Sequence, residues 1–299
     1  MGNNDVIIAT QSGFGAGFLE WRIETPHLAL AALVWGPDDG IPVLALHGWL
    51  DNAASFTGVA PRLDSCRVVA LDLPGHGHSA HRPPGTIYHF VDYVHDVVAA
   101  AEALDWERFS LLGHSLGAAV ACFVAAALPE RVTKLALVEG LGPLSRESLD
   151  NPRALGRSLA QYQQMADKRP PRYDSVEAAA EARRKAGNLS PAAARTLTER
   201  GIKHIPEGIT WRSDPRLTFT SPSYYSEAQV LAFLAAIRAP TLLIRASQGY
   251  LVQREIMPAR YRQVPGLELH DLPGGHHLHL EDPAPSGALL RAFLQNGAG

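Results

Sequence analysis

The stretch FSLLGHSLGAAVACFVAAAL, residues 109–128, decides the fold of this chain. Its first four residues, FSLL, are mostly apolar, as in a buried strand, and the residues from Leu116 onward have the small apolar character of a packed helix. Between them lies GHSLG at 113–117, a G-x-S-x-G pattern whose small residues permit a turn sharp enough to project a serine oxygen from a sheet edge. Strand, tight turn and helix in this order predict one unit of an α/β fold.

The same pattern makes Ser115 a candidate nucleophile. Glycines two positions before and after the serine suit a strained turn that leaves no room for side chains. The alternative interpretation is a loop serine beside a helix start. A serine hydroxyl is a poor nucleophile unless a base, oriented by a third group, takes its proton. The chain must therefore supply a base and an acid elsewhere if Ser115 is catalytic.

Short β-rich apolar runs alternate with helical patterns along the chain, which is typical of a mainly parallel sheet covered by helices. Helices are predicted at 88–104 and 116–128. The first two of eight predicted strands are separated by Thr25, Pro26 and His27, which predicts an antiparallel pair. The predicted strands are 18–24, 28–35, 42–48, 67–72, 109–115, 134–140, 241–246 and 267–272.

Composition bounds the class of protein. A chain of 299 residues can bury a large core, and 27 basic against 30 acidic residues give a net charge of −3, which does not suggest a nucleic-acid partner. The apolar run 117–129 is too short to span a bilayer, and the start MGNNDVIIAT lacks the pattern of a signal peptide. We expect a soluble cytoplasmic protein without membrane insertion. Cys66 and Cys122 are expected to be inert residues of the core.

About 100 residues separate the strand that ends near Glu139 from the next one at 241. Helix starts are predicted inside this segment at Asp174, Ser190 and Ser226, because each begins a capping or Ser-Pro pattern. We expect a helical lid at 142–235, inserted after strand six into a core made of 1–141 and 236–299. The basic cluster Arg183, Arg184 and Lys185 is expected on a solvated helix face.

Three histidines compete for the role of base. His276, His277 and His279 lie in LPGGHHLHLEDP, after the last predicted strand. Composition alone does not choose among them. A metal site built on HHLH has little support, since no second cluster of ligating residues is suggested elsewhere, and we expect no metal.

Four motifs resemble those of the α/β-hydrolase superfamily, in their usual order: LHGW at 46–49, DLPGHGHS at 72–79, GHSLGA at 113–118 and GGHHLHLEDP at 274–283. The chain is most similar to bacterial serine hydrolases and serine hydrolase-like proteins, which carry HGWLDN as it stands at 47–52. The resemblance implies a mostly parallel eight-stranded sheet flanked by helices, with a helical cap after strand six.

The resemblance also selects the base. In the family the catalytic histidine follows a glycine and precedes an acid by five residues and a proline by seven. His276 fits this pattern with Gly275, Glu281 and Pro283. His277 and His279 do not.

The acid departs from the usual pattern of the family. Most similar members place it just after the seventh strand, but SQGYLVQ at 247–253 contains no Asp or Glu. A minority branch, which includes some haloalkane dehalogenases, places it at the end of strand six, where Glu139 stands. Pairing with His276 would also satisfy a carboxylate in an apolar strand end. The alternative for Glu139 is a surface residue at the strand end. We expect Glu139 to be the triad acid, with Asp271 and Glu255 as the fallbacks.

The oxyanion hole is expected from the backbone N–H groups of Trp49 and Leu116. His47 is expected to support this loop. The aromatic residues of the insertion are expected mostly in packing roles. His114 is expected either to pack beside the nucleophile or to line the pocket wall. His114, Trp211 and Tyr224 are the residues that we assign to the substrate pocket.

These residues predict a two-step acyl transfer. Serine at the elbow argues against dehalogenation, because the dehalogenase branch of the family uses aspartate there. We expect a carboxylic ester hydrolase with no metal or organic cofactor, acting on a small-to-medium, largely apolar ester, thioester or lactone. C–C bond hydrolysis, perhydrolysis and amide cleavage remain open on the same triad. A non-catalytic ligand sensor on a hydrolase fold is a further alternative.

Overall fold

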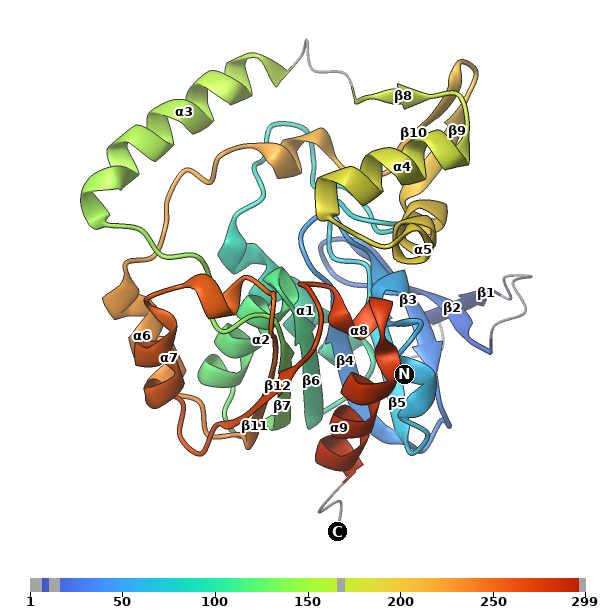
Figure 1. Ribbon diagram of the computed structural model, residues 1–299. Helices are drawn as coiled ribbons and strands as arrows, with labels where there is room; N and C mark the ends of the chain where they lie inside the picture. Colours follow the sequence, from blue (N-terminus) through green and yellow to red (C-terminus); the bar gives the residue numbers. More distant parts are fainter. Residues whose placement is uncertain (1–6, 11–16, 166–169, 296–299) are drawn as a thin grey trace.

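The computed structural model describes residues 7–10, 17–165 and 170–295. Within them, the main sheet has nine strands in the order β1-β2-β3-β5-β4-β6-β7-β11-β12 (Figure 1). The eight strands expected from the sequence all form, and β1 adds a ninth at one edge. The strands are β1 (Ile7–Thr10), β2 (Leu19–Glu24), β3 (Ala29–Trp35), β4 (Ile41–Leu46), β5 (Cys66–Leu71), β6 (Phe109–His114), β7 (Val132–Val138), β11 (Thr241–Ala246) and β12 (Glu268–Leu272).

The strands β5, β4, β6, β7, β11 and β12 of the main sheet run parallel to one another. By contrast, β1, β2 and β3 are antiparallel to their neighbours. In the register of the sheet, His114 at the end of β6 pairs with Val138 of β7, and Val138 pairs with Ile244 of β11. The carboxyl ends of these three strands therefore meet at one edge. This is the edge where parallel α/β sheets place their sites.

Helices cover both faces of the sheet. The helices predicted at 88–104 and 116–128 form as α1 (Phe90–Ala103) and α2 (Leu116–Ala127), and their buried residues belong to the larger hydrophobic cluster. The opposite face carries α9 (Pro283–Gln295), whose Leu290 and Leu294 belong to the second cluster. Two smaller helices follow β11 and β12, namely α7 (Met257–Gln263) and α8 (Leu278–Glu281).

The segment between β7 and β11 is not purely helical, in contrast to the expectation from the sequence. Figure 1 shows its helices α3, α4 and α5 above the sheet. Three short strands, in the order β8-β10-β9, form a separate small sheet. These strands have two to four residues each, too few for an alternating pattern to stand out. The elements are α3 (Asn151–Gln163), β8 (Arg172–Tyr173), α4 (Val176–Gly187), α5 (Pro191–Gly201), β9 (Ile202–Ile205), β10 (Gly208–Trp211), the 3₁₀ helices η3 (Ser148–Asp150) and η5 (Pro215–Thr218), and α6 (Glu227–Ala235).

The last helix of this segment belongs to the core. Val230 and Leu234 of α6 are fully buried in the cluster that contains α2, so residues 227–235 pack with the core although we expected them in the lid. The caps at Ser190 and Ser226 form as predicted. The cap of α4 is Ser175, one residue after the expected Asp174, because the Ser175 side chain accepts from the N–H of Ala178.

The two cysteines lie in the interior. Cys66 on β5 and Cys122 on α2 are both free and buried. Burial raises the pKa of Cys66 to about 11 and that of Cys122 to about 12. Both thiols therefore stay protonated and unreactive near neutral pH, as expected. In the part of the chain described here, no helix has the length and apolar character needed to cross a membrane.

Candidate active site

Ser115 stands at the turn between β6 and α2 with a φ of 52°, in the left-handed region that L-residues rarely adopt. The glycines of the motif permit this turn. A Cβ on Gly113 would lie 2.5 Å from the Cα of Ala118, and one on Gly117 would lie 2.0 Å from the carbonyl oxygen of Leu46. Larger residues at either position would force strand and helix apart.

Glu139 stands directly after β7, beside the turn that carries Ser115, and is 2% exposed. Its carboxylate accepts hydrogen bonds from the backbone N–H of Ala246 at 2.7 Å and of Tyr250 at 2.9 Å. A Cβ on Gly249 would lie 2.2 Å from the same carboxylate, so this glycine leaves the space that the acid fills. The buried carboxylate is thus held by one backbone donor at the end of β11 and one in the loop that follows it.

The structure brings Ser115, His276 and Glu139 into one hydrogen-bonded row. Nε2 of His276 lies 2.9 Å from Oγ of Ser115, and Nδ1 of His276 lies 3.2 Å from Oε2 of Glu139. With Nδ1–H donating to Glu139, Nε2 is free to accept the hydroxyl proton of Ser115. Burial lowers the pKa of His276, while the hydrogen bond to Glu139 opposes that shift. The imidazole is therefore neutral at pH 7, the state that a base requires.

The fallback acids lie elsewhere. Asp271 is exposed and forms an ion pair with Arg245 on the adjacent strand. Glu255 is also exposed, in the loop before α7. Glu139 is the carboxylate that contacts His276 in the structure.

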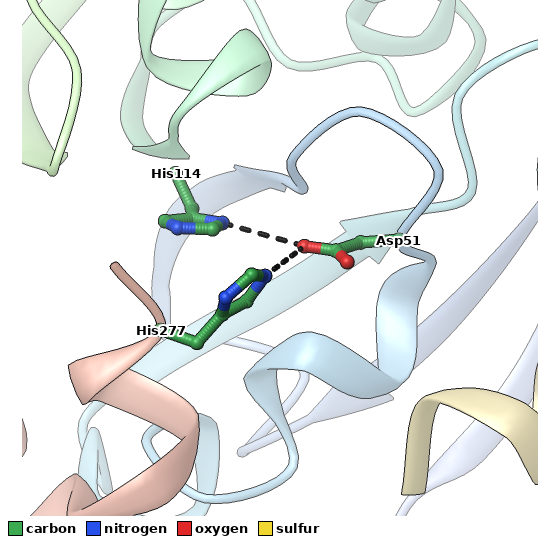
Figure 2. Close-up of side chains that lie close together, drawn as sticks. All are labelled: Asp51, His114 and His277. Atoms are coloured by element: carbon green, nitrogen blue, oxygen red, sulfur yellow. Dashed lines mark hydrogen bonds and ion pairs between the residues drawn. The ribbon is translucent and has the colours of Figure 1, made fainter. Parts of the chain in front are cut away.

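The neighbouring histidines point away from Ser115. His277 Nε2 lies 3.1 Å from Oδ2 of Asp51, and His279 Nε2 lies 2.8 Å from Oγ of Ser55 in the interior. Figure 2 shows that His277 and His114 both face Asp51, which lies in the loop after β4. No sequence pattern indicates this cluster, because its members come from three distant segments.

Asp51, His114 and His277 are the described residues that could hold a metal ion, since their ligand atoms all lie within 4.8 Å of one another. The contacts favour a hydrogen-bonded network instead. Oδ1 of Asp51 already accepts from the guanidinium of Arg183, and a divalent cation would add to that positive charge in a buried cluster. Oδ2 accepts from His277. One carboxylate therefore already has partners on both oxygens.

The loop that follows β4 is fastened to the serine turn. The carbonyl of His47 accepts from the N–H of Gly117 at 3.0 Å, and the buried imidazole of His47 donates to the carbonyl of Gly48 at 2.7 Å. Within the described residues, the backbone N–H groups of Trp49 and Leu116 donate to no other protein group. Two unpaired donors on either side of this junction fit the requirement of an oxyanion hole.

The expected pocket residues do not gather at Ser115. His114 is fully buried, and its ring lies 4.8 Å from that of His276. It therefore packs against His276 instead of lining a pocket. Trp211 donates from Nε1 to the hydroxyl of Tyr173 at 3.3 Å and borders a cavity of about 160 Å³. The ring of Tyr224 lies under the guanidinium of Arg146, 4.4 Å away.

The cavity beside Trp211 lies between the loop after β4 and the segment above the sheet. It is bordered by Leu50, Asp51 and Asn52 from the loop and by Tyr173, Arg183 and Trp211 from that segment. A larger cavity, of about 500 Å³, lies between Pro61, Arg62 and Asp64 on one side and α9 on the other. Ser115 lines neither of them.

Comparison with known proteins places these observations in a family. Residues 41–283 match the sequence profile described as alpha/beta hydrolase fold. A serine hydrolase-like protein of Danio rerio is 37% identical over 289 residues, which cover 92% of this chain and 88% of that protein. Serine hydrolase-like protein 2 of Homo sapiens is 30% identical over 294 residues, which cover 92% of this chain and 94% of that protein.

Solved structures show the same likeness. A hypothetical protein from Pseudomonas aeruginosa PAO1 superposes with a TM-score of 0.88 at 49% identity, covering 92% of this chain and 98% of that one. The thioesterase domain from the curacin biosynthetic pathway superposes with a TM-score of 0.82 at 26% identity, covering 91% of this chain and 99% of that one.

Proposed function

The chain belongs to the α/β-hydrolase family, and on that premise we propose that it is a serine hydrolase acting on small-to-medium, largely apolar carboxylic esters, thioesters or lactones. The observation that carries the proposal is the row in which His276 contacts Ser115 at 2.9 Å and Glu139 at 3.2 Å. Nucleophile, base and orienting acid in this order are what acyl transfer by serine requires.

In the acylation step, Oγ of Ser115 attacks the carbonyl carbon of the substrate while Nε2 of His276 takes the hydroxyl proton. The imidazolium that forms is stabilised by Glu139, whose two backbone hydrogen bonds keep its carboxylate in place. The tetrahedral intermediate collapses, His276 returns the proton to the leaving group, and an alcohol or thiol departs. Ser115 then carries the acyl group.

In the second step, water attacks the acyl carbonyl and His276 again takes the proton. Collapse releases the carboxylic acid and returns the proton to Oγ of Ser115. The same three residues serve both steps, and atoms and charges balance without a cofactor.

The negative oxygen of each tetrahedral intermediate needs donors that are already in place. The N–H groups of Trp49 and Leu116 are proposed for this role, because both are unpaired in the described structure and the bond between His47 and Gly117 fixes their loops together. One such donor typically changes turnover by about 10²–10³.

The substrate class follows from the surroundings of the serine. Ser115 and His276 are half-buried, and residues 142–226 are proposed to form a lid over this edge of the sheet. A covered site favours compact, apolar acyl groups. The likeness to a thioesterase domain supports thioesters as one member of the class.

The proposal is tested on purified protein with p-nitrophenyl esters of increasing chain length, lactones and acyl-thioesters, together with labelling by a fluorophosphonate probe. Wild-type protein should hydrolyse members of the series and be labelled, whereas Ser115→Ala should lose both properties and keep its thermal unfolding profile. Ser247→Ala is the matched control, because this serine is exposed in the loop after β11.

Two outcomes would reject the proposal. A Ser115→Ala protein that is still labelled would show that another residue reacts with the probe. A folded wild-type protein that is neither labelled nor active on the three substrate classes would favour a C–C bond hydrolase or a ligand sensor.

A further inference from the structure

Asp51 lies between the lid and the loop that carries His276. Its side chain is 1% exposed. Oδ1 accepts from Nη2 of Arg183, which is on lid helix α4, and Oδ2 accepts from Nε2 of His277 at 3.1 Å (Figure 2). A single buried carboxylate thus joins an element of the lid to the residue that follows His276.

The neighbours of Asp51 also contact the lid. Trp49 donates from Nε1 to the carbonyl of Leu217 at 3.0 Å, and Asn52 donates from Nδ2 to the carbonyl of Leu197 at 2.8 Å. Leu217 lies in η5 and Leu197 in α5, so the loop at 49–52 contacts three different elements of the lid. The same loop holds the N–H of Trp49 proposed for the oxyanion hole.

His114 contacts the backbone of the same loop and lies beside Asp51. Its Nε2–H donates to the carbonyl oxygen of His276 at 2.9 Å, and its Nδ1 lies 3.5 Å from Oδ2 of Asp51. The ring of His276 lies 4.8 Å from that of His114 and 5.2 Å from that of His277. The loop at 274–279 is thus held at His277 by the carboxylate of Asp51 and at the carbonyl of His276 by the imidazole of His114.

The contact between Arg183 and Asp51 is a nearly buried ion pair beside this arrangement. The guanidinium of Arg183 brings a positive charge next to the carboxylate of Asp51 and the two histidines beside it. The Arg183 side chain is 14% exposed. Removing one partner of a buried ion pair leaves an uncompensated charge, which is strongly unfavourable. Displacement of α4 would therefore free Asp51 to shift or to take up a proton, and would loosen its hold on His277.

We propose that Arg183 and Asp51 are positioning residues for the reaction. Docking of α4 on Asp51 fixes the loop that carries His276 and the loop that carries the N–H of Trp49, so that the reaction centre is completed only when the lid is docked. This inference rests on the proposed function. Arg183 and Asp51 act through other residues and need not touch the substrate.

The experiment compares Arg183→Met with Arg184→Met on the best substrate of the series. Arg184 neighbours Arg183 on the same helix but pairs with Glu181 at the surface, which makes it a matched control. Because small misplacements of a base can cost about 10²-fold in rate, Arg183→Met should lower kcat by about 10- to 100-fold with KM changed less than about 3-fold. Arg184→Met should behave as wild type.

A double-mutant cycle tests whether Arg183 acts through Asp51. The double variant Asp51→Asn with Arg183→Met should have the kcat of Asp51→Asn alone within about 2-fold, because the second change removes a contact that is already lost. Arg183→Lys, which keeps the positive charge, should recover part of kcat and covers the case in which Asp51→Asn does not fold. Amide hydrogen exchange at 274–279 should accelerate in Arg183→Met and not in Arg184→Met.

The outcomes separate this inference from the function on which it rests. An active wild-type enzyme in which Arg183→Met matches Arg184→Met in kcat and in hydrogen exchange would overturn the positioning role alone. Effects of Arg183→Met and Asp51→Asn that multiply in the double variant would do the same. A wild-type protein that is neither labelled nor active would overturn both proposals.

Discussion

Ser115 and Glu139 directly follow the neighbouring parallel strands β6 and β7, and both have φ in the left-handed region, at 52° and 51°. The N–H of Ser115 donates to the carbonyl of Val138, and the N–H of Glu139 donates to that of Ile244, so each turn is tied to the next strand. Residues held in this region cost about 1–3 kcal/mol each and persist where the surroundings fix them. The strain places both side chains beside His276.

The first prediction concerns the acid. Glu139→Gln should lower kcat by about 10²–10⁴ with substrate binding little changed, because an amide does not stabilise the imidazolium of His276 as an anion does. Its NH₂ group would also oppose one of the two backbone donors. Steady-state kinetics on the ester series measures the effect, and Asp271→Asn serves as the surface control. Near wild-type turnover in a folded Glu139→Gln enzyme would remove Glu139 from the triad.

The second prediction concerns the pH profile. Protonation of His276 removes the base, so kcat/KM should fall as pH decreases through its pKa. Burial lowers that pKa, and the midpoint of the acid limb should therefore lie below the ordinary value of about 6.5. Initial rates between pH 4.5 and pH 8 measure the limb. A profile without an acid limb in this interval would argue against a histidine base.

The third prediction uses the space beside Glu139. Gly249→Ala would place a methyl group 2.2 Å from the carboxylate and should displace it, lowering kcat by about 10-fold or more through misalignment of His276. Gly156→Ala on α3 is the control, because a Cβ there meets nothing within 4 Å. Kinetics and thermal unfolding are measured on both. Equal activity of the two variants would show that the acid tolerates displacement.

The fourth prediction concerns acid stability. Burial lowers the pKa of His76 to about 3, whereas an unfolded histidine titrates near 6.5. The unfolded chain therefore binds an extra proton between these values, and stability present above about 6.5 is lost as pH falls. From pH 7 to pH 5 this single group accounts for about 2 kcal/mol of the free energy of unfolding.

Urea unfolding at the two pH values measures this loss. His76→Gln should reduce the difference between pH 7 and pH 5, whatever it does to stability at either pH. His204→Gln, at an exposed position on β9, provides the comparison. An unchanged difference in His76→Gln would mean that other buried histidines account for the loss.

Much of the fold could be predicted because buried parallel strands consist of nearly continuous apolar runs in the sequence. FSLL and LALV each predict a strand, and the glycines at 113 and 117 predict the turn between strand and helix. The resemblance to one branch of the α/β-hydrolase family pointed to Glu139 as the acid, and the strand pattern supports that choice. A carboxylate at the end of an apolar strand requires a partner, and the parallel register places that end beside the serine.

The contacts of Asp51 with Arg183 and with the loop at 274–279 could not be predicted in this way. Arg183 was expected on a solvated basic face, but its partner Asp51 lies 132 residues away and is reached only because the segment between β7 and β11 folds back to the loop after β4. For His114, which precedes Ser115, the sequence left packing and pocket wall both open, and its full burial agrees with the packing role. Alternation across a strand end turns adjacent side chains in different directions, and this one points into the protein.

Because both native thiols are buried, the protein is suited to site-specific labelling with a fluorophore. Cys66 and Cys122 lie in the interior, so maleimide dyes should spare them in the native state. Lys185 is 70% exposed on α4, two residues from Arg183, and a cysteine introduced there would accept a fluorophore selectively. Excursions of that helix could then be followed in real time without rebuilding the core.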